Sequence, residues 1–223
     1  MPPKDNQPTV PAYLEPYRDA LAHHGPTFEA TLWKSRHAQR ARFRALVRMI
    51  DLRGRTVVDA GCGLGDFAAY LAEQRIAIGR YIGVDAFPDL MDRARARSLA
   101  GAEFRMADFA RNTAEFSALL GEVGAEVVVF SGSLNTFEQP AAIAVLGPAF
   151  EAARVEIAFN FLSAASPVPR IDPEDPARRF DPAAMLAWAL SRTPLVRLRS
   201  DYLRGHDATI AMRHAGDKGA PIM

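Results

Sequence analysis

The sequence predicts an α/β protein with a doubly wound, mostly parallel seven-stranded sheet. The first observation is that strand-like and helix-like segments alternate from residue 56 to residue 161, as in parallel sheets with crossover helices. The second is a glycine-rich loop directly after the first strand, where such sheets bind ligands. The third is that two strand-like segments, 195–202 and 208–213, end the chain without a helix between them. They predict an antiparallel C-terminal hairpin at the sheet edge.

The N-terminal part predicts two helices before the sheet begins. A first helix is expected over 14–23, and a longer one begins after Ser35, a good N-cap residue. Phe43, Leu46, Val47 and Ile50 give the longer helix an apolar face at helical spacing. We expect this pair of helices to cover part of the sheet.

The strands and helices of the sheet region follow in strict alternation. Residues 126–130 form the most β-branched segment, which predicts a central strand buried on both faces. Gly147-Pro148 predicts a possible break in the helix over 141–152. The other expected strands are 56–59, 81–85, 103–107 and 155–161, and the other expected helices are 67–74, 90–99 and 113–120.

Proline distribution defines the domain organisation. The proline-rich residues 1–12 predict a disordered tail, and residues 215–223 a frayed one. The stretch 163–180 also contains several prolines and predicts a long loop over the working edge of the sheet. Asp181-Pro182 then starts a last helix. We expect one domain over 13–214, in which residues 13–52 form an N-terminal helical cap.

Composition excludes several classes of function. The formal net charge of the 223 residues is +1, so no overall field favours nucleic acid or a membrane surface. No apolar run approaches the length of a membrane span. The single cysteine, Cys62, cannot form an internal disulfide and has no metal-ligand spacing to other Cys or His residues. A cytoplasmic protein without a metal site is expected, and its oligomeric state stays open.

The glycine-rich loop runs from Asp59 to Asp66 and contains three alternating glycines, which allow the backbone to approach a ligand closely. It differs from the dinucleotide motif, because Asp66 occupies the position of the last glycine and would repel a pyrophosphate. Asp59 adds a second acid before the first glycine. An acidic loop suits a ligand that carries positive charge and no phosphate, and it weakens the dinucleotide hypothesis.

Asp85 ends the second strand, about 20 residues after the loop, the interval at which an acid binds a ribose. Its carboxylate can accept hydrogen bonds from both ribose hydroxyls. The alternative is a helix N-cap, because a helix begins soon afterwards. The interval and the loop together favour the ribose role.

The pattern acid-x-G-x-G-x-G resembles motif I of the class I S-adenosylmethionine-dependent methyltransferases. From about Tyr13 to Arg213 the chain resembles a group of bacterial class I methyltransferases whose substrate is unassigned. It implies a Rossmann-like methyltransferase fold, S-adenosyl-L-methionine as cofactor and methyl transfer by in-line displacement. The segments that carry it are Trp33-Lys34-Ser35, Gln39, Arg42-Phe43, Gly65-Asp66-Phe67, Ser131-Gly132-Ser133-Leu134-Asn135 and Phe159–Ser163.

The resemblance implies roles for individual residues. Asp108 and Phe109 would hold the adenine, and Arg42 would hold the carboxylate at the methionine end, under the two N-terminal helices. The expected cofactor-binding residues are Asp59, Gly61, Cys62, Gly63, Asp85, Ala86, Asp108, Phe109, Ser131, Arg42 and Trp33. The expected substrate-binding residues are Ser133, Asn135, Gln39 and His37. No residue stands out as the catalytic base.

Three hypotheses about function remain open. The first is a methyltransferase for a small molecule; Arg170, Arg178 and Arg179 beside the proline-rich loop would favour an acidic acceptor. The second is an RNA methyltransferase, because arginines recur every four residues from Arg36 to Arg48, although such a stripe is more often a solvated face. The N/D-P-P-Y/F motif of amide and adenine methylation is absent. The third is a non-catalytic regulatory module that binds S-adenosylmethionine.

Overall fold

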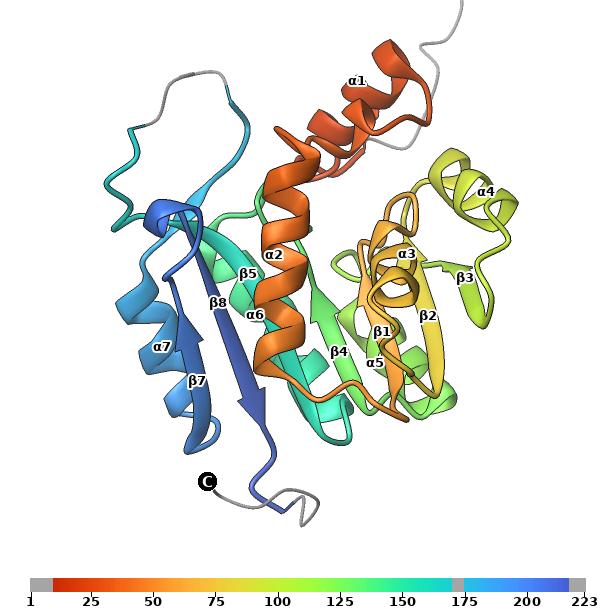
Figure 1. Ribbon diagram of the computed structural model, residues 1–223. Helices are drawn as coiled ribbons and strands as arrows, with labels where there is room; N and C mark the ends of the chain where they lie inside the picture. Colours follow the sequence, from red (N-terminus) through yellow and green to blue (C-terminus); the bar gives the residue numbers. More distant parts are fainter. Residues whose placement is uncertain (1–9, 170–174, 217–223) are drawn as a thin grey trace, which may run out of the picture.

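The sheet has the strand order β3-β2-β1-β4-β5-β8-β7 (Figure 1). A short strand β6 pairs with β5. The computed structural model describes residues 10–169 and 175–216. All neighbouring pairs are parallel except β5 with β8 and β8 with β7. The strands are β1 Thr56–Ala60, β2 Arg80–Asp85, β3 Ala102–Met106, β4 Val127–Phe130, β5 Glu156–Ser163, β6 Arg179–Phe180, β7 Leu195–Arg199 and β8 Asp207–Arg213.

Helices cover both faces of this sheet, as the alternating pattern predicts. Adjacent strand residues point to opposite faces, so Val57 packs with α2, α3 and α4 and Val58 packs with α5 and α6. The helices are α1 Glu15–His24, α2 Arg36–Met49, α3 Asp66–Glu73, α4 Pro88–Ala96, α5 Thr113–Val123, α6 Gln139–Ala152 and α7 Pro182–Leu190. Two short 3₁₀ helices, η1 Glu29–Thr31 and η2 Leu203–Gly205, lie before α2 and before β8.

The strand order determines where the ligand crevice lies in the sheet. Connections run from β1 outward through β2 and β3, and then return to β4 on the other side of β1. The loops after β1 and β4 therefore diverge at the carboxyl ends of these neighbouring strands, which is where open α/β sheets bind ligands. Figure 1 shows α1 at this end of the sheet.

The structure confirms the predicted fold class and the central position of β4, whose four residues are all buried. It also confirms two helix starts: the Ser35 hydroxyl accepts a hydrogen bond from Ala38 N, and the Asp181 carboxylate accepts one from Ala183 N. The expected break at Gly147-Pro148 is wrong, because α6 continues through both residues. Its buried residues from Ala142 to Phe150 hold the helix against the sheet on both sides of the proline.

The proline-rich stretch also differs from a plain loop. Strand β5 extends to Ser163, two residues beyond its expected end, because Leu162 and Ser163 pair with β6 inside that stretch. The disordered tails expected over 1–12 and 215–223 fall almost entirely outside the described residues. Within the described ranges, no helix has the length and apolar character needed to cross a membrane.

Candidate functional site

The glycine loop leaves β1 with three left-handed glycines, Gly61, Gly63 and Gly65, at φ values of 78°, 53° and 74°. Only glycine adopts this region without steric strain. The amides of Gly61 and Cys62 both donate to the carbonyl of Val84, which ties the loop to β2. A Cβ on Gly61 would lie 2.4 Å from that of Ser133, so this glycine also allows close packing against the loop after β4.

A cavity opens above this loop and has an empty volume of about 580 Å³, its open mouth included. We call it the first cavity. The ends of β1, β2 and β4, the loop after β3 and the N-terminal segment contribute its walls. It is lined by Tyr13, Leu14, Tyr17, Thr31, Trp33, Gly61, Gly63, Asp85, Ala86, Phe87, Leu90, Asp108, Phe109, Ser131, Gly132, Ser133 and Phe137.

Asp85 lies at the end of β2 and is 8 % exposed. One carboxylate oxygen accepts a hydrogen bond from Gly63 N at 2.9 Å, and the other accepts one from Phe87 N at 3.1 Å. Burial raises the pKa of this carboxyl. Each oxygen retains acceptor capacity, so the same side chain can brace the loop and bind ligand hydroxyls.

Asp108 lies after β3 and is held from two sides. Its Oδ1 accepts hydrogen bonds from Ala110 N and Arg111 N, both at 3.1 Å. The Tyr13 hydroxyl donates toward both carboxylate oxygens, and desolvation together with this contact raises the pKa of Tyr13. The chain segment before α1 therefore reaches the acid that was expected to face adenine.

Aromatic rings build the wall around Asp108. Tyr13 stacks on Phe137 with ring centroids 4.6 Å apart, and Phe137 stacks on Phe109 at 6.1 Å. On α1, the Tyr17 hydroxyl contacts the Gly132 carbonyl at 3.5 Å, and burial raises the pKa of Tyr17 to about 12. The sequence analysis missed these residues. Tyr13 lies in the turn before α1 and Tyr17 in the first turn of that helix, and both rings line the first cavity.

Asp59 does not line the first cavity. It lies behind the glycine loop in a narrower adjoining cavity, where its carboxylate accepts a hydrogen bond from the Tyr81 hydroxyl. Burial raises its pKa to about 7. Cys62 lies in the same cavity, and burial likewise raises the pKa of its thiol, so the sulfur stays protonated and is no nucleophile.

Asp66 and Gln39 contact each other at the start of α3. Gln39 Nε2 donates to one carboxylate oxygen of Asp66 at 3.0 Å, and Arg97 forms an ion pair with the other at 2.6 Å. Both residues line the narrower cavity and neither lines the first. The charge of Asp66 is therefore compensated by Arg97.

Arg42 and Trp33 lie together between α2 and the sheet. The structure directs the Arg42 guanidinium to the buried carboxylate of Asp207, and its Cζ lies 4.7 Å from the centre of the Trp33 ring. Trp33 lines the first cavity, whereas Arg42 lines a second, adjoining cavity. Arg42 thus has a carboxylate partner within the protein.

The expected substrate-binding residues are not all brought together. Ser133 lines the first cavity, and its hydroxyl donates to the Ala60 carbonyl at 2.6 Å. Asn135 lines the second cavity, and His37 is exposed in the first turn of α2. Ser131, at the end of β4, accepts a hydrogen bond from Asn160 Nδ2 at 3.2 Å.

The arginine stripe of α2 is partly engaged within the protein. Arg40 makes a bidentate ion pair with Glu73 at 2.7 and 2.9 Å, and Arg36 stacks over the Phe28 ring. Arg44 and Arg48 are exposed. Two of the four guanidinium groups therefore have partners within the fold.

The chemistry of the first cavity fits a cationic nucleoside. Its described lining contains two carboxylates, Asp85 and Asp108, and no Lys, Arg or His. A phosphate would meet uncompensated negative charge there, whereas a sulfonium or ammonium group would be attracted. The aromatic side chains among the lining residues offer a flat apolar surface to a purine.

Residues 57–154 match the profile of a family described as a methyltransferase domain. This segment of the chain carries a methyltransferase domain. The family expected from the sequence, that of the S-adenosylmethionine-dependent methyltransferases, is confirmed. The matched segment begins in β1 and ends just after α6, so it contains the glycine loop, Asp85 and Asp108.

Solved structures with the same fold are similar to this methyltransferase. Magnesium protoporphyrin IX methyltransferase from Synechocystis PCC 6803 with bound SAH is 16 % identical over 80 % of this chain and 83 % of its own, with a TM-score of 0.58. A SAM-dependent methyltransferase from Archaeoglobus fulgidus is 16 % identical over 81 % and 95 %, with a TM-score of 0.60. A DhpI-SAM-HEP complex is 14 % identical over 91 % and 98 %, with a TM-score of 0.62. No curated protein matches the sequence significantly.

Proposed function

We propose that this chain transfers a methyl group from S-adenosylmethionine to a small-molecule acceptor by in-line displacement. The observation that carries the proposal is the charge of the first cavity, whose described lining holds two carboxylates and no cationic side chain. One structural neighbour is named for a small-molecule acceptor, magnesium protoporphyrin IX. A cation without phosphates is the ligand that this cavity favours electrostatically.

Within this proposal, each acid has a separate task. Asp85, fixed by Gly63 N and Phe87 N, accepts the ribose hydroxyls. Asp108 accepts from the adenine amino group, and Phe109 packs beside the ring. Gly61 and Gly63 bring the backbone close to the methionine end, since neither has a side chain in the way.

The cofactor supplies an activated methyl group on a positively charged sulfur, so the protein has to orient the reactants and exclude water. Tyr13, Tyr17 and Trp33 line the first cavity from the N-terminal segment. We infer that residues 13–52 act as a cap on one domain that extends to residue 214. The cap removes water, which would otherwise screen the attraction between the carboxylates and the sulfonium.

Calorimetric titration with S-adenosylmethionine tests this proposal. Asp85→Ala removes a charged hydrogen-bond acceptor, and we expect the affinity to fall roughly 10- to 100-fold. Gly63→Arg places a long side chain at a left-handed position in the cavity wall, and we expect binding to be lost. Asp89→Asn, an exposed position in α4, serves as the matched control.

Thermal melts establish that each variant is folded. Asp85→Asn preserves the shape of the side chain and separates the loss of charge from the loss of packing. If both Asp85→Ala and Gly63→Arg bind the cofactor as tightly as the wild type, the first cavity is not its site.

A further inference from the structure

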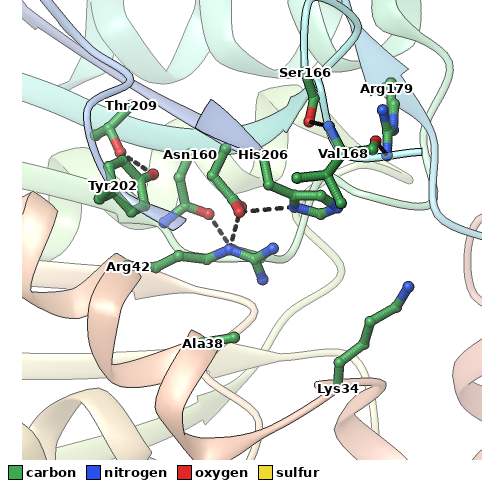
Figure 2. A network of polar contacts seen from close by, with 12 residues as sticks. Lys34, Ala38, Arg42, Asn160, Ser166, Val168, Arg179, Tyr202, His206 and Thr209 are labelled. Atoms are coloured by element: carbon green, nitrogen blue, oxygen red, sulfur yellow. Dashed lines mark hydrogen bonds and ion pairs between the residues drawn. The ribbon is translucent and has the colours of Figure 1, made fainter. Parts of the chain in front are cut away.

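A second cavity adjoins the first where the Arg42 guanidinium stacks on Trp33. Figure 2 shows three of its lining residues, Arg42, Arg179 and His206, with their polar contacts. Its walls come from α2, from the described ends of the loop that follows β5 and from the turn before β8. The empty volume is about 1090 Å³, the open mouth included. Leu32, Leu162, Pro169 and Ala177 contribute apolar surface to it.

The described lining of the second cavity has the opposite charge balance to the first. Its cations are Lys34, Arg42, Arg179 and Arg204, and its anions are Asp175 and Asp207. Both acids are already in ion pairs, Asp175 with Lys34 at 2.8 Å and Asp207 with Arg42. Four cations against two anions leave two positive charges, carried by Arg179 and Arg204, with the histidine counted as neutral.

One histidine faces this cavity with a fixed orientation. His206 Nδ1 lies 2.9 Å from Oδ2 of Asp207, and the other carboxylate oxygen of Asp207 binds Arg42 Nε. The Asp207 side chain is fully buried, so its position is set by the fold. Nε2 of His206 has no hydrogen-bond partner among the described residues. A carboxylate on Nδ1 favours the tautomer in which Nε2 carries a lone pair.

The backbone that presents His206 is strained. Leu203 and Arg204 have φ values of 48° and 59°, in the left-handed region that side chains disfavour, and Gly205 follows at 73°. Such strain persists where the surrounding structure enforces it. Here it brings Arg204 and His206 into the wall of the same cavity.

The two cavities adjoin each other without a lining residue in common. Trp33 faces the first, and the Arg42 guanidinium stacked on it faces the second. The segment after β4 also passes from one to the other, because Ser131 to Ser133 line the first cavity and Asn135 lines the second. A molecule in the second cavity would therefore lie next to one in the first.

We propose that the second cavity binds the methyl acceptor as a small organic acid, through Arg179 and Arg204, and that His206, positioned by Asp207, accepts the proton of its nucleophilic hydroxyl or amine. This inference rests on the proposed function. Carboxylates and phosphates share the chemistry that guanidinium groups recognise. Within the described residues neither Arg179 nor Arg204 has a carboxylate partner, and Arg179 is oriented by a hydrogen bond that it donates to the Val168 carbonyl at 2.8 Å. The charge of the acid anchors the molecule and leaves its nucleophilic group near the imidazole.

The reaction balances without a further reactant. The oxygen or nitrogen of the acceptor forms a bond to the methyl carbon as the bond between that carbon and sulfur breaks. The electron pair of the broken bond stays on sulfur, which becomes a neutral thioether. The proton of the acceptor passes to Nε2 of His206 and leaves to solvent after release of the product.

Proton NMR of the full chain with S-adenosylhomocysteine bound tests the anion site without knowledge of the natural acceptor. Benzoate, phenyl phosphate and the neutral benzyl alcohol are the probes, and the imidazole signal of His206, assigned with His206→Gln, is the readout. We expect benzoate or phenyl phosphate to shift this signal and to bind at least tenfold more tightly than benzyl alcohol. Tighter binding of benzoate would indicate an acceptor with a carboxylate, and tighter binding of phenyl phosphate would indicate a phosphorylated acceptor.

Two variants and a control locate the binding. Arg179→Gln and Arg204→Gln should each weaken anion binding roughly tenfold, whereas Arg44→Gln, on the exposed side of α2, should leave it unchanged. The anion site is overturned if the anions bind no more tightly than benzyl alcohol. It is also overturned if Arg179→Gln and Arg204→Gln both bind the anions as tightly as the wild type. Calorimetry of S-adenosylmethionine on the same samples separates this failure from failure of the proposed function, because that ligand binds in the first cavity.

The nitrogen-15 shifts of His206 test the proton acceptor. Above neutral pH we expect a protonated Nδ1 and an unprotonated Nε2, and we expect Asp207→Asn to lose this preference. The charged groups that line the cavity together with the imidazole are Asp207, Arg42, Arg179, Arg204, Lys34 and Asp175. A protonated Nε2 in the neutral wild-type ring overturns the role of His206.

Discussion

The hydroxyl of Tyr13 lies 2.9 and 2.8 Å from the two carboxylate oxygens of Asp108, a residue 95 positions further along the chain. This contact joins the N-terminal segment to the loop after β3 across the first cavity. It occupies the carboxylate that the proposed adenine amino group would need. In the proposed function, the N-terminal segment and the adenine amino group therefore compete for this carboxylate.

Tyr13→Phe should tighten S-adenosylmethionine binding roughly 3- to 10-fold. The ring that stacks on Phe137 is kept, and Ala110 N and Arg111 N still orient Asp108, so only the competing donor is lost. Calorimetry measures the affinity. Tyr17→Phe is the control, because its hydroxyl contacts a backbone carbonyl and no carboxylate. Weaker binding by Tyr13→Phe would mean that the hydroxyl supports the cofactor.

Asp59 should make the folded state less stable as pH rises from 5 to 7. Burial raises its pKa from 3.8 to about 7, so in this range the folded protein holds a proton that the unfolded chain has released. Stability then falls by up to about 1.4 kcal/mol per pH unit, on the order of 2 kcal/mol across the range. Urea unfolding at both pH values measures it.

The Asp59→Asn variant should lack this component of the pH dependence, because an amide does not titrate. The Asp89→Asn variant, which changes an exposed residue, should retain the wild-type pH dependence of stability. An equal change of stability between pH 5 and 7 in the wild type and in Asp59→Asn would show that Asp59 titrates normally.

Gly132→Ala should destabilise the protein by about 1–3 kcal/mol. Gly132 has a φ of 75°, and an added Cβ would lie 2.7 Å from the Trp33 ring. Because Trp33 must move, its fluorescence should also shift. Gly121→Ala is the matched control: it lies inside α5 with open space around it, and we expect a gain of about 0.5–1 kcal/mol. If thermal unfolding shows Gly132→Ala to be more stable than Gly121→Ala, this explanation is wrong.

Arg42→Met should cost about 3 kcal/mol of unfolding free energy, because it leaves the buried Asp207 without its guanidinium. Adding Asp207→Asn removes the stranded charge and should recover part of this loss. Arg40→Met, which breaks an exposed pair with Glu73, should change stability little. Denaturant titrations of the single and double variants give the coupling free energy between Arg42 and Asp207. If the losses of unfolding free energy in the two single variants simply add in the double variant, the two side chains do not form a buried pair.

The sequence by itself determined the sheet, the glycine loop and the acids at the ends of β2 and β3. These features are local: β-branched runs, three alternating glycines and an acid about 20 residues later are readable from neighbours along the chain. The caps at Ser35 and Asp181 are of the same kind, because each side chain binds an amide two or three residues away.

Only the tertiary structure decided which of these residues meet across the chain. The contacts of Tyr13 with Asp108, Arg42 with Asp207 and Arg97 with Asp66 join positions from 31 to 165 residues apart. No local pattern encodes such pairs, because they depend on how the N-terminal segment and the helices pack against the sheet and against one another. The same packing makes Arg42 a partner of Asp207 and brings His206 to the second cavity, since the charge of a side chain is known from the sequence but its partner is set by the fold.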